Sequence, residues 1–203
     1  GRHVAFASND PTEVPGDTNG VLDVYAYDRA TGTRVRVSVD STGTEVNNGS
    51  GPGVAISPDG RFVAFPSVAS NMVPGDTNGF SDVFLHDRDT DGDGVFDEPG
   101  AISTVRVSVD SAGQQGNGFS WNPVVSADGR FVAFDSQATN LVANDTSGIA
   151  DAFLHDTLTG STECVSRRNT PPTNPSGGGG ATLSADGRFV AFTSSDTSLV
   201  PPG

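Results

Sequence analysis

A six-residue segment that occurs four times is the feature that most limits how this chain can fold. Residues 1–6, Gly-Arg-His-Val-Ala-Phe, return with Phe in place of His at 60–65, 129–134 and 187–192. The four arginines of these segments lie 59, 69 and 58 positions apart. Such a period is typical of repeats that each form a small unit and bury their apolar faces against a neighbour. The chain therefore holds three periods and the opening of a fourth.

The longer middle period comes from an insertion. Twenty positions separate Asp87 from Val107, whereas nine separate the corresponding residues in the pairs Asp28–Val37 and Asp156–Val165. The additional 11 residues include the run Asp-Gly-Asp-Gly. The other two units lack these residues, so we expect the insertion to form a loop of its own and the fold not to depend on it.

Each repeat is predicted to form four short strands, which in the second unit cover 53–57, 61–67, 81–87 and 103–109. The segment 57–60, Ser-Pro-Asp-Gly, has the composition of a tight turn. The following Phe-Val-Ala-Phe is apolar without alternation, as in strands that are covered on both faces. The chain has 24 Val but 7 Leu, and 39 of its 203 residues are Gly or Pro, which favours strands and turns over helices. We therefore predict an all-β protein.

Three elements of the repeat resemble a known family. They are Ser-Pro/Ala-Asp-Gly-Arg-Phe-Val-Ala-Phe, then Asp-Val-Phe-Leu-His-Asp-Arg, then a Thr-Gly turn. Together they resemble the TolB-like, WD-type β-propeller repeat over the whole chain. The resemblance implies tandem four-stranded antiparallel blades of β-propeller type, about three blades and part of a fourth. It implies little about function, because this fold hosts hydrolases, lyases, periplasmic scaffolds and surface proteins.

The repeat boundaries divide the chain into four segments. We expect a first blade at 1–52 that lacks its first strand, and a second blade at 53–121 that carries the insertion. A third blade is expected at 122–180, and the start of a fourth at 181–203. Since propellers need about four to eight blades to close a ring, residues 1–7 and 181–194 are expected to contact another blade. That blade belongs either to a continuation of the repeat array or to another copy of the chain.

The charge of the chain excludes some partners. The formal net charge is −14, which disfavours binding to nucleic acid or to an anionic membrane surface. No apolar run approaches the roughly 18 residues that a membrane helix needs, so membrane insertion is not expected. The acids are 21 Asp and 4 Glu. The short Asp side chain suits turns and the ligation of hard cations such as Ca²⁺.

The insertion carries the strongest motif in the chain. Residues 89–97, Asp-Thr-Asp-Gly-Asp-Gly-Val-Phe-Asp, place carboxylates at loop positions 1, 3, 5 and 9 and glycine at position 6. This is the oxygen-ligand spacing of an EF-hand-type calcium loop, with a backbone carbonyl at position 7. Position 12 is Gly100, so the usual bidentate Glu is missing. The predicted calcium ligands are Asp89, Asp91, Asp93, Val95 and Asp97; the alternative is a solvated acidic hairpin tip.

A shorter motif, Asp-x-Asn/Ser-Gly-x-x-Asp, occurs once in each of the three units. It matches the last seven positions of the same loop and offers four oxygen ligands, so water or a neighbouring loop would have to supply the rest. The alternative is that Asn-Gly forms a turn and the final Asp accepts backbone N–H bonds. The candidate ligands are Asp17, Asn19, Val21 and Asp23; Asp76, Asn78, Phe80 and Asp82; and Asp145, Ser147, Ile149 and Asp151.

Other reactive side chains fall at repeated structural positions. His86 and His155 match Tyr27, which indicates a ring packed between blades. Arg36 and Arg106 match each other and are expected to cover a strand face. Cys164 takes their position in the third unit, and a single cysteine excludes an internal disulfide.

The motifs favour a non-enzymatic function. The first hypothesis is an extracellular or cell-surface, calcium-binding β-propeller-repeat protein with a structural or adhesive role. In one version of this hypothesis, copies of the chain assemble head to tail. A second is the propeller domain of a secreted hydrolase or carbohydrate-active enzyme, with Trp121 as a carbohydrate-stacking platform or else a buried indole. A third is a TolB-like periplasmic scaffold that binds proteins.

Overall fold

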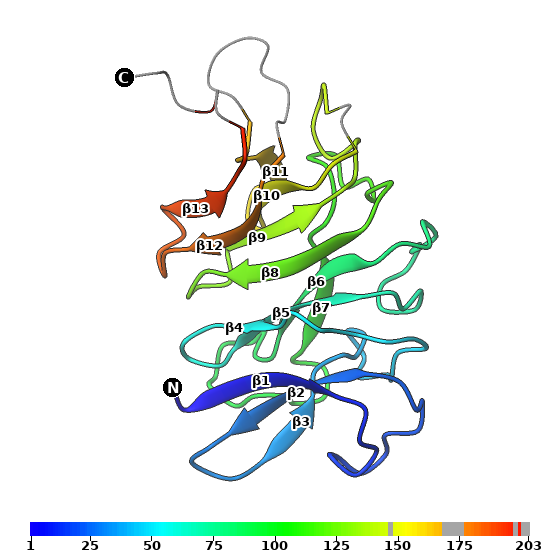
Figure 1. Cartoon of the computed structure of the whole chain (residues 1–203). Coiled ribbons are helices and arrows are strands. Elements are labelled where there is room, and N and C mark those ends of the chain that lie inside the picture. The colour runs from blue at the N-terminus through cyan, green and yellow to red at the C-terminus, as the bar shows by residue number, and fades with distance from the viewer. Residues whose placement is uncertain (146–147, 168–176, 197–198, 200–203) are drawn as a thin grey trace.

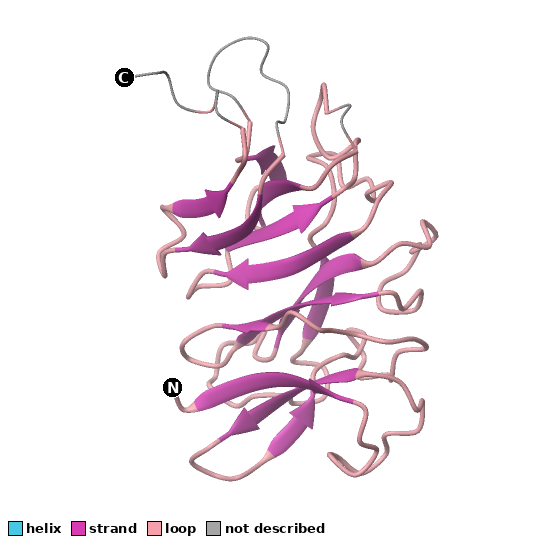
Figure 2. Cartoon of the chain, viewed as in Figure 1, coloured by secondary structure: helices cyan, strands magenta, loops and turns pink. Residues whose placement is uncertain are grey.

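The structure is a computed structural model, and it describes all residues except 146–147, 168–176, 197–198 and 200–203. Four antiparallel sheets stack one on another along the molecule (Figure 1). Colouring by secondary structure shows strands and loops only (Figure 2), and the described residues contain no helix. The predicted all-β class with blade-type sheets is thus confirmed.

The sheets follow the chain order without crossovers. The first has three strands: β1 (His3–Ser8), β2 (Asp23–Asp28) and β3 (Arg34–Arg36). The second has four: β4 (Ala55–Ile56), β5 (Phe62–Ser67), β6 (Asp82–Asp87) and β7 (Ser103–Arg106). The third also has four: β8 (Ser120–Val125), β9 (Phe131–Ser136), β10 (Asp151–Asp156) and β11 (Ser161–Cys164). The last is the pair β12 (Gly179–Leu183) and β13 (Val190–Thr193).

Two strands cross the segment limits expected from the repeat. β8 begins at Ser120, ahead of the limit at 122, and β12 begins at Gly179, ahead of the limit at 181. β8 begins early because Ser120 lies opposite Ser136 on the neighbouring strand, and a register shift follows between Trp121 and Val124. β7 ends at Arg106, short of residue 109, because the Ser108 hydroxyl accepts the Val83 N–H (3.1 Å).

Apolar side chains from facing sheets form a core between each pair of neighbours. Between the first and second sheets, Val24 and Ala26 pack with Val63, Phe65 and Phe84. The equivalent core between the second and third sheets is built from Ala64, Val83, Leu85, Val132, Phe134 and Phe153. Full burial of each Val or Phe side chain contributes about 1.5–3 kcal/mol. The repeated apolar strand therefore holds the blades together as well as forming them.

A ring-over-glycine contact recurs between neighbouring units. The Phe62 ring of one unit lies against Gly129 in the turn of the next, and Phe131 lies in the same way against Gly187. His3 makes the equivalent contact with Gly60. A Cβ built on Gly129 would lie 2.5 Å from the Phe62 ring, closer than any real contact. Glycine in this turn is therefore required by the packing of the blades as well as by its φ of 71°.

We expect Gly129→Ala to destabilise the fold more than Gly79→Ala does. Both glycines have a φ of 71°, but an added Cβ at Gly79 meets no atom within 4 Å. The backbone strain, about 1 kcal/mol, is therefore shared, and only Gly129→Ala adds the overpacking cost of roughly 1–3 kcal/mol against Phe62. Urea unfolding of both variants measures the difference. Equal losses would contradict a packing role for the ring.

A hydrogen-bonded junction also recurs between units. Thr104 Oγ1 donates to the Val39 carbonyl of the first unit (2.6 Å), and its N–H donates to Ser41 Oγ (2.9 Å). The buried His86 ring is bonded to the same hydroxyl through Nδ1 (2.8 Å). Ser111, Thr162 and His155 repeat these contacts one unit later. Burial lowers the pKa of His86 to about 4, so the ring is neutral and structural, as the repeat position predicted.

Candidate functional site

The inserted loop brings three of its four carboxylates together. Asp89 is buried and accepts the N–H groups of Gly92 (3.0 Å), Asp93 (3.1 Å) and Gly94 (3.2 Å). Carboxylate oxygens of Asp89, Asp91 and Asp93 lie within 4.8 Å of one another. Two oxygens that each lie about 2.3–2.6 Å from one calcium ion can be no more than roughly 5 Å apart. The three side chains therefore fit the ligand geometry of a single hard cation.

One of the predicted ligands in this loop, Asp97, has another partner. Asp97 has a φ of 65° and pairs with Arg88, whose Nε donates to its Oδ1 at 2.9 Å. The Val95 N–H donates to Asp93 Oδ1 (2.8 Å), and the Val95 carbonyl stays a predicted ligand. Asp97 was predicted at ligand position 9, and its carboxylate is instead turned to an arginine that the sequence analysis did not pair with it.

In the first repeated loop, an arginine side chain lies among the acidic groups. Arg36 Nη1 is 3.5 Å from Asp17 Oδ1, 3.8 Å from Asp23 Oδ2, and bonded to Glu45. Oxygens of Asp17, Asp23 and Glu45 lie within 4.8 Å of one another. The Asn19 amide donates to Asp23 Oδ2 (2.9 Å), and its side-chain oxygen accepts the Val21 N–H (3.0 Å). These are the contacts of a turn that is capped and closed by a guanidinium.

The second repeated loop has the same construction. Arg106 Nη1 lies 3.2 Å from Asp76 Oδ1 and 2.9 Å from Asp82 Oδ2. Gln115 occupies the place of Glu45 and accepts a bond from the same nitrogen at 3.0 Å. The Asn78 amide donates to Asp82 Oδ2 (2.9 Å), and its oxygen accepts the Phe80 N–H (3.0 Å).

The positive charge in these two loops thus comes from arginine. Burial raises the pKa of Asp23 and of Asp76, and the neighbouring arginines act in the opposite direction by favouring the charged carboxylates. Calcium at these loops stays a prediction, because an ion would have to take carboxylate oxygens from the guanidinium. The repeat contained the missed signal: Arg36 and Arg106 stand at the same position in successive units.

The third repeated loop lacks this arginine. Cys164 stands in its place on β11 and is buried, which raises the pKa of its thiol to about 11. Asp145 and Asp151 are buried, and Asp151 Oδ1 accepts bonds from Ser166 Oγ (2.7 Å) and the Gly177 N–H (3.0 Å). The Ile149 side chain is exposed. Ser147, the remaining candidate ligand, lies outside the described residues.

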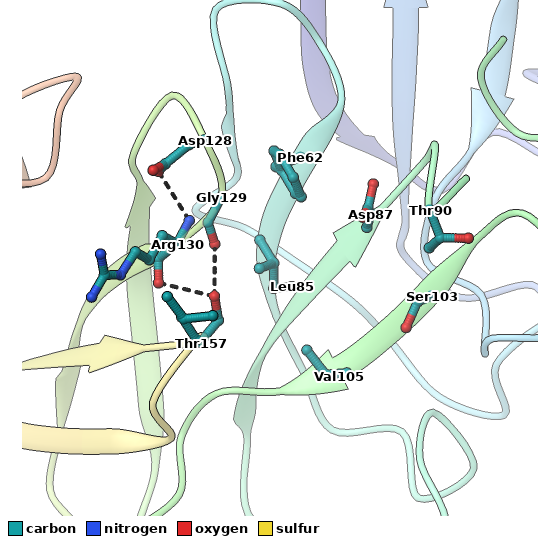
Figure 3. Close-up of a pocket in the computed structure, with 11 residues that line it drawn as sticks. Phe62, Leu85, Asp87, Thr90, Ser103, Val105, Asp128, Gly129, Arg130 and Thr157 are labelled. Atoms are coloured by element: carbon teal, nitrogen blue, oxygen red, sulfur yellow. Dashed lines mark hydrogen bonds between the residues drawn. The ribbon is translucent and has the colours of Figure 1, made fainter. Parts of the chain in front are cut away.

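A groove between the second and third sheets is a site that the sequence analysis missed. It has a volume of about 450 Å³. Phe62, Leu85 and Val105 from the second sheet line it together with Gly129 and Thr157 from the third unit (Figure 3), and Leu158 also lines it. The groove exists only because two units meet there, so no single segment of the sequence reveals it.

Comparison with solved structures places this geometry in a known fold. The chain is similar to TolB from Acinetobacter baumannii, with 19% identity and a TM-score of 0.51 over 97% of this chain and 36% of that chain. It is also similar to a putative TolB from Agrobacterium tumefaciens, with 19% identity and a TM-score of 0.44 over 81% of this chain and 45% of that one. The first of these similarities shows that the fold is that of TolB-type β-propeller blades, as the repeat predicted. The chain spans less than half the length of either structure.

Sequence comparisons add no family. No family model matches the chain, and a search of the curated proteins finds no match. Among the described residues there is also no helix that is long and apolar enough to cross a membrane.

Proposed function

We propose that this chain is part of a non-enzymatic, extracytoplasmic β-propeller module that binds a protein partner. The supporting observation is that the candidate reactive groups are engaged in structural contacts. Asp23 and Asp82 each pair with an arginine and accept hydrogen bonds from an asparagine and a serine. His86 supports a junction between units, and the Cys164 thiol is buried. The groove between the second and third sheets, in contrast, is open, and it combines apolar side chains such as Phe62, Leu85 and Val105 with polar ones at its rim. Exposed apolar surface with a polar rim is typical of sites that bind a protein partner.

Site-specific photocrosslinking in the producing cell tests this proposal. A photoreactive amino acid replaces Leu158 at the groove or, as the control, Val68, which is exposed elsewhere on the second unit. A defined crosslinked protein from position 158, and none from position 68, is the expected result. Equal labelling at both positions, or turnover of a substrate that depends on the described acidic residues, would overturn the proposal.

We further propose that the insertion binds one calcium ion through Asp89, Asp91 and Asp93. Their clustered oxygens support this, and waters would complete the coordination that calcium requires. The ion would neutralise repulsion among three adjacent carboxylates and fix the loop between the first and second units. The structural and adhesive roles considered above would then depend on extracellular calcium.

Millimolar calcium is expected to raise the melting temperature of the native chain. For a dissociation constant near 0.1 mM and free calcium near 1 mM, binding contributes roughly 1.4 kcal/mol. Asp91→Ala removes an exposed ligand and should abolish the shift, whereas Glu163→Ala, an exposed acid on β11, should keep it. Melting curves with calcium and with chelator measure both. A shift that survives Asp91→Ala would place the ion elsewhere.

The end of the stack is proposed to be covered by a further blade. Phe189 occupies the position of Phe62 and Phe131 but is 61% exposed, because no described turn glycine lies over it. In the second unit, Met72 and Thr104 contact the first unit. In the first unit, the equivalent positions are Glu13 and Arg34, which pair with each other at 3.3 Å. The first unit therefore lacks the two side chains that the second unit uses to pack on the unit before it. For this reason we propose that a further repeat, and not the first unit of a second copy, packs against Phe189.

A further inference from the structure

Two grooves of the molecule are equivalent by repeat position. One lies between the first and second sheets and has a volume of about 620 Å³, and the other is the 450 Å³ groove between the second and third sheets. Six residues that line the first groove have a counterpart at the same repeat position, one unit later, that lines the second groove. The pairs are His3 with Phe62, Asp28 with Asp87, Thr33 with Ser103, Val35 with Val105, Asp59 with Asp128, and Arg88 with Thr157. The contents of one groove therefore indicate what fits the other.

The first groove is partly filled by the chain itself. The insertion places the Phe96 ring 5.9 Å from the His3 ring, centroid to centroid. The Arg88 guanidinium lies 4.8 Å from the centre of the Phe96 ring and donates through Nη1 to the Gly60 carbonyl at 2.8 Å. Arg88 is buried, and its charge is balanced by Asp97. An aromatic ring stacked on a guanidinium thus occupies part of this type of groove.

The second groove lacks both of these groups. Thr157 replaces Arg88, and its hydroxyl donates to the carbonyl of Gly129 (3.3 Å) or of Arg130 (3.0 Å). The hairpin of the third unit has no insertion, so no described segment enters in the place of Phe96. As a result Leu158 is 74% exposed and Val105 is 45% exposed.

Two acidic side chains, Asp87 and Asp128, line the second groove. Asp87 is paired with Arg61 (2.7 Å), whose guanidinium lies 4.8 Å from the centre of the Phe62 ring, so Asp128 supplies the negative charge that faces a partner. The Arg130 guanidinium points away from Phe62 and Leu85 (Figure 3), since it stacks on the Phe131 ring and pairs with Asp156 at 2.8 Å. The chain as a whole carries a net charge of −14. A cationic partner is therefore complementary to this site, and the long-range field favours its approach.

We propose that the second groove binds a segment of a partner protein that presents an aromatic side chain and an arginine close together. The ring would lie against Phe62, Leu85 and Val105, in the position that Phe96 has in the first groove. The arginine would take the place of Arg88, near Asp128 and the carbonyl of Gly129. This proposal rests on the protein-binding function proposed above and specifies the chemistry of the partner.

Titration of the ¹⁵N-labelled chain with a capped Gly-Ser-Arg-Phe-Gly-Ser peptide tests the proposal. Amide shifts are expected at Leu85, Val105 and Leu158. Burial of one aromatic ring is worth about 1.5–3 kcal/mol, which is roughly 10- to 100-fold in affinity. Replacing Phe in the peptide by Ala should therefore weaken binding at least about tenfold, and replacing Arg by Glu should also weaken it.

Variants of the chain locate the site. Val105→Asp and Leu158→Asp change exposed positions and should each weaken peptide binding, whereas Val68→Asp, at an equally exposed valine outside the groove, should not. Circular dichroism checks that each variant folds, and Leu158→Asp in the hairpin decides the matter if Val105→Asp does not fold. Shifts away from the groove, or equal binding by the Val68 and Leu158 variants, would overturn the proposal.

Other occupants would also give distinct results. Benzyl alcohol binding as tightly as the peptide would show a site for small aromatic compounds and would overturn the proposal. A dimer that Leu158→Asp dissociates, measured by light scattering, would show that a second copy is the occupant. If the peptide does not bind but position 158 still crosslinks to a defined protein, the protein-binding function stands and only the chemistry proposed for the partner fails, so the two proposals fail independently.

Discussion

Arg106→Met is expected to lower the free energy of unfolding by about 3–5 kcal/mol, because it leaves buried carboxylates without their counter-charge. Arg106 lies within 3.2 Å of Asp76 and 2.9 Å of Asp82, and both carboxylates are nearly inaccessible to water. The net stability of a domain is typically about 5–15 kcal/mol, so this single change removes a large part of it. Urea unfolding at pH 7 measures the loss.

Arg130→Met is the matched control. Arg130 also pairs with an aspartate, but at the surface, where solvent screens the pair. We expect a far smaller loss of stability than for Arg106→Met. If Arg106→Met and Arg130→Met lower the free energy of unfolding equally, the buried Arg106 does not stabilise the repeated loop more than a surface pair would.

The loss in Arg106→Met should shrink as the pH falls. Burial already raises the pKa of Asp76 in the native chain, and removal of the guanidinium raises it further. An acid whose pKa is higher in the folded state than in the unfolded state binds its proton more tightly when folded. Acidification through that raised pKa therefore favours the folded state, and stability is lost again as the pH rises. Urea unfolding of the variant at pH 7 and pH 4.5, with the native chain alongside, tests this sign.

The same variant tests calcium at the repeated loops. With the guanidinium removed, Asp76 and Asp82 become available to an ion. If this loop suits calcium, millimolar calcium will stabilise Arg106→Met more than it stabilises the native chain. An identical response of both proteins would leave only the turn-and-cap role for this motif.

Phe134→Ala is expected to cost about 3–5 kcal/mol, the usual loss for a large aromatic removed from a core. Phe134 is fully buried between the second and third sheets, and its ring lies 5.8 Å from that of Phe153. Because each blade packs only on its neighbours, the cavity weakens the interface on which both blades depend. Urea unfolding with Phe119→Ala as control provides the comparison.

Phe119→Ala makes the same substitution as Phe134→Ala, but at a position that is less buried. Phe119 is 47% exposed, although its ring makes an edge contact with Phe80 at 5.1 Å. We expect its removal to cost much less than the removal of Phe134. A small effect of Phe134→Ala would contradict the assignment of the inter-sheet core as the main source of stability.

Local chemistry was enough to predict much of this fold. The turn at 57–60, the apolar strand after it and the spacing between repeats are properties of short segments, and they identified the sheets and their order. The insertion was also recognisable, because its Asp-Gly run interrupts a pattern that resumes at Val107. Three of its four predicted carboxylates lie together because loop positions 1, 3 and 5 are close in any tight turn.

The partners of these side chains were decided by the tertiary structure. The repeat predicts that Arg36 and Arg106 cover a strand face, whereas in the structure each closes an acidic loop that is distant in sequence but adjacent across the sheet. Asp97 was a candidate ligand and pairs with Arg88, because the loop turns back on the hairpin where it begins.

The repeated unit follows from local sequence alone, since strands and turns depend on neighbours along the chain. Which charges meet, and where a groove stays open, depends on how one unit lies against the next. Phe62 illustrates both: its place in the apolar strand follows from the repeat, but its contacts with Gly129 and with the groove exist only when two blades pack. Burial and ion pairing act through space, and only the folded chain brings those atoms together.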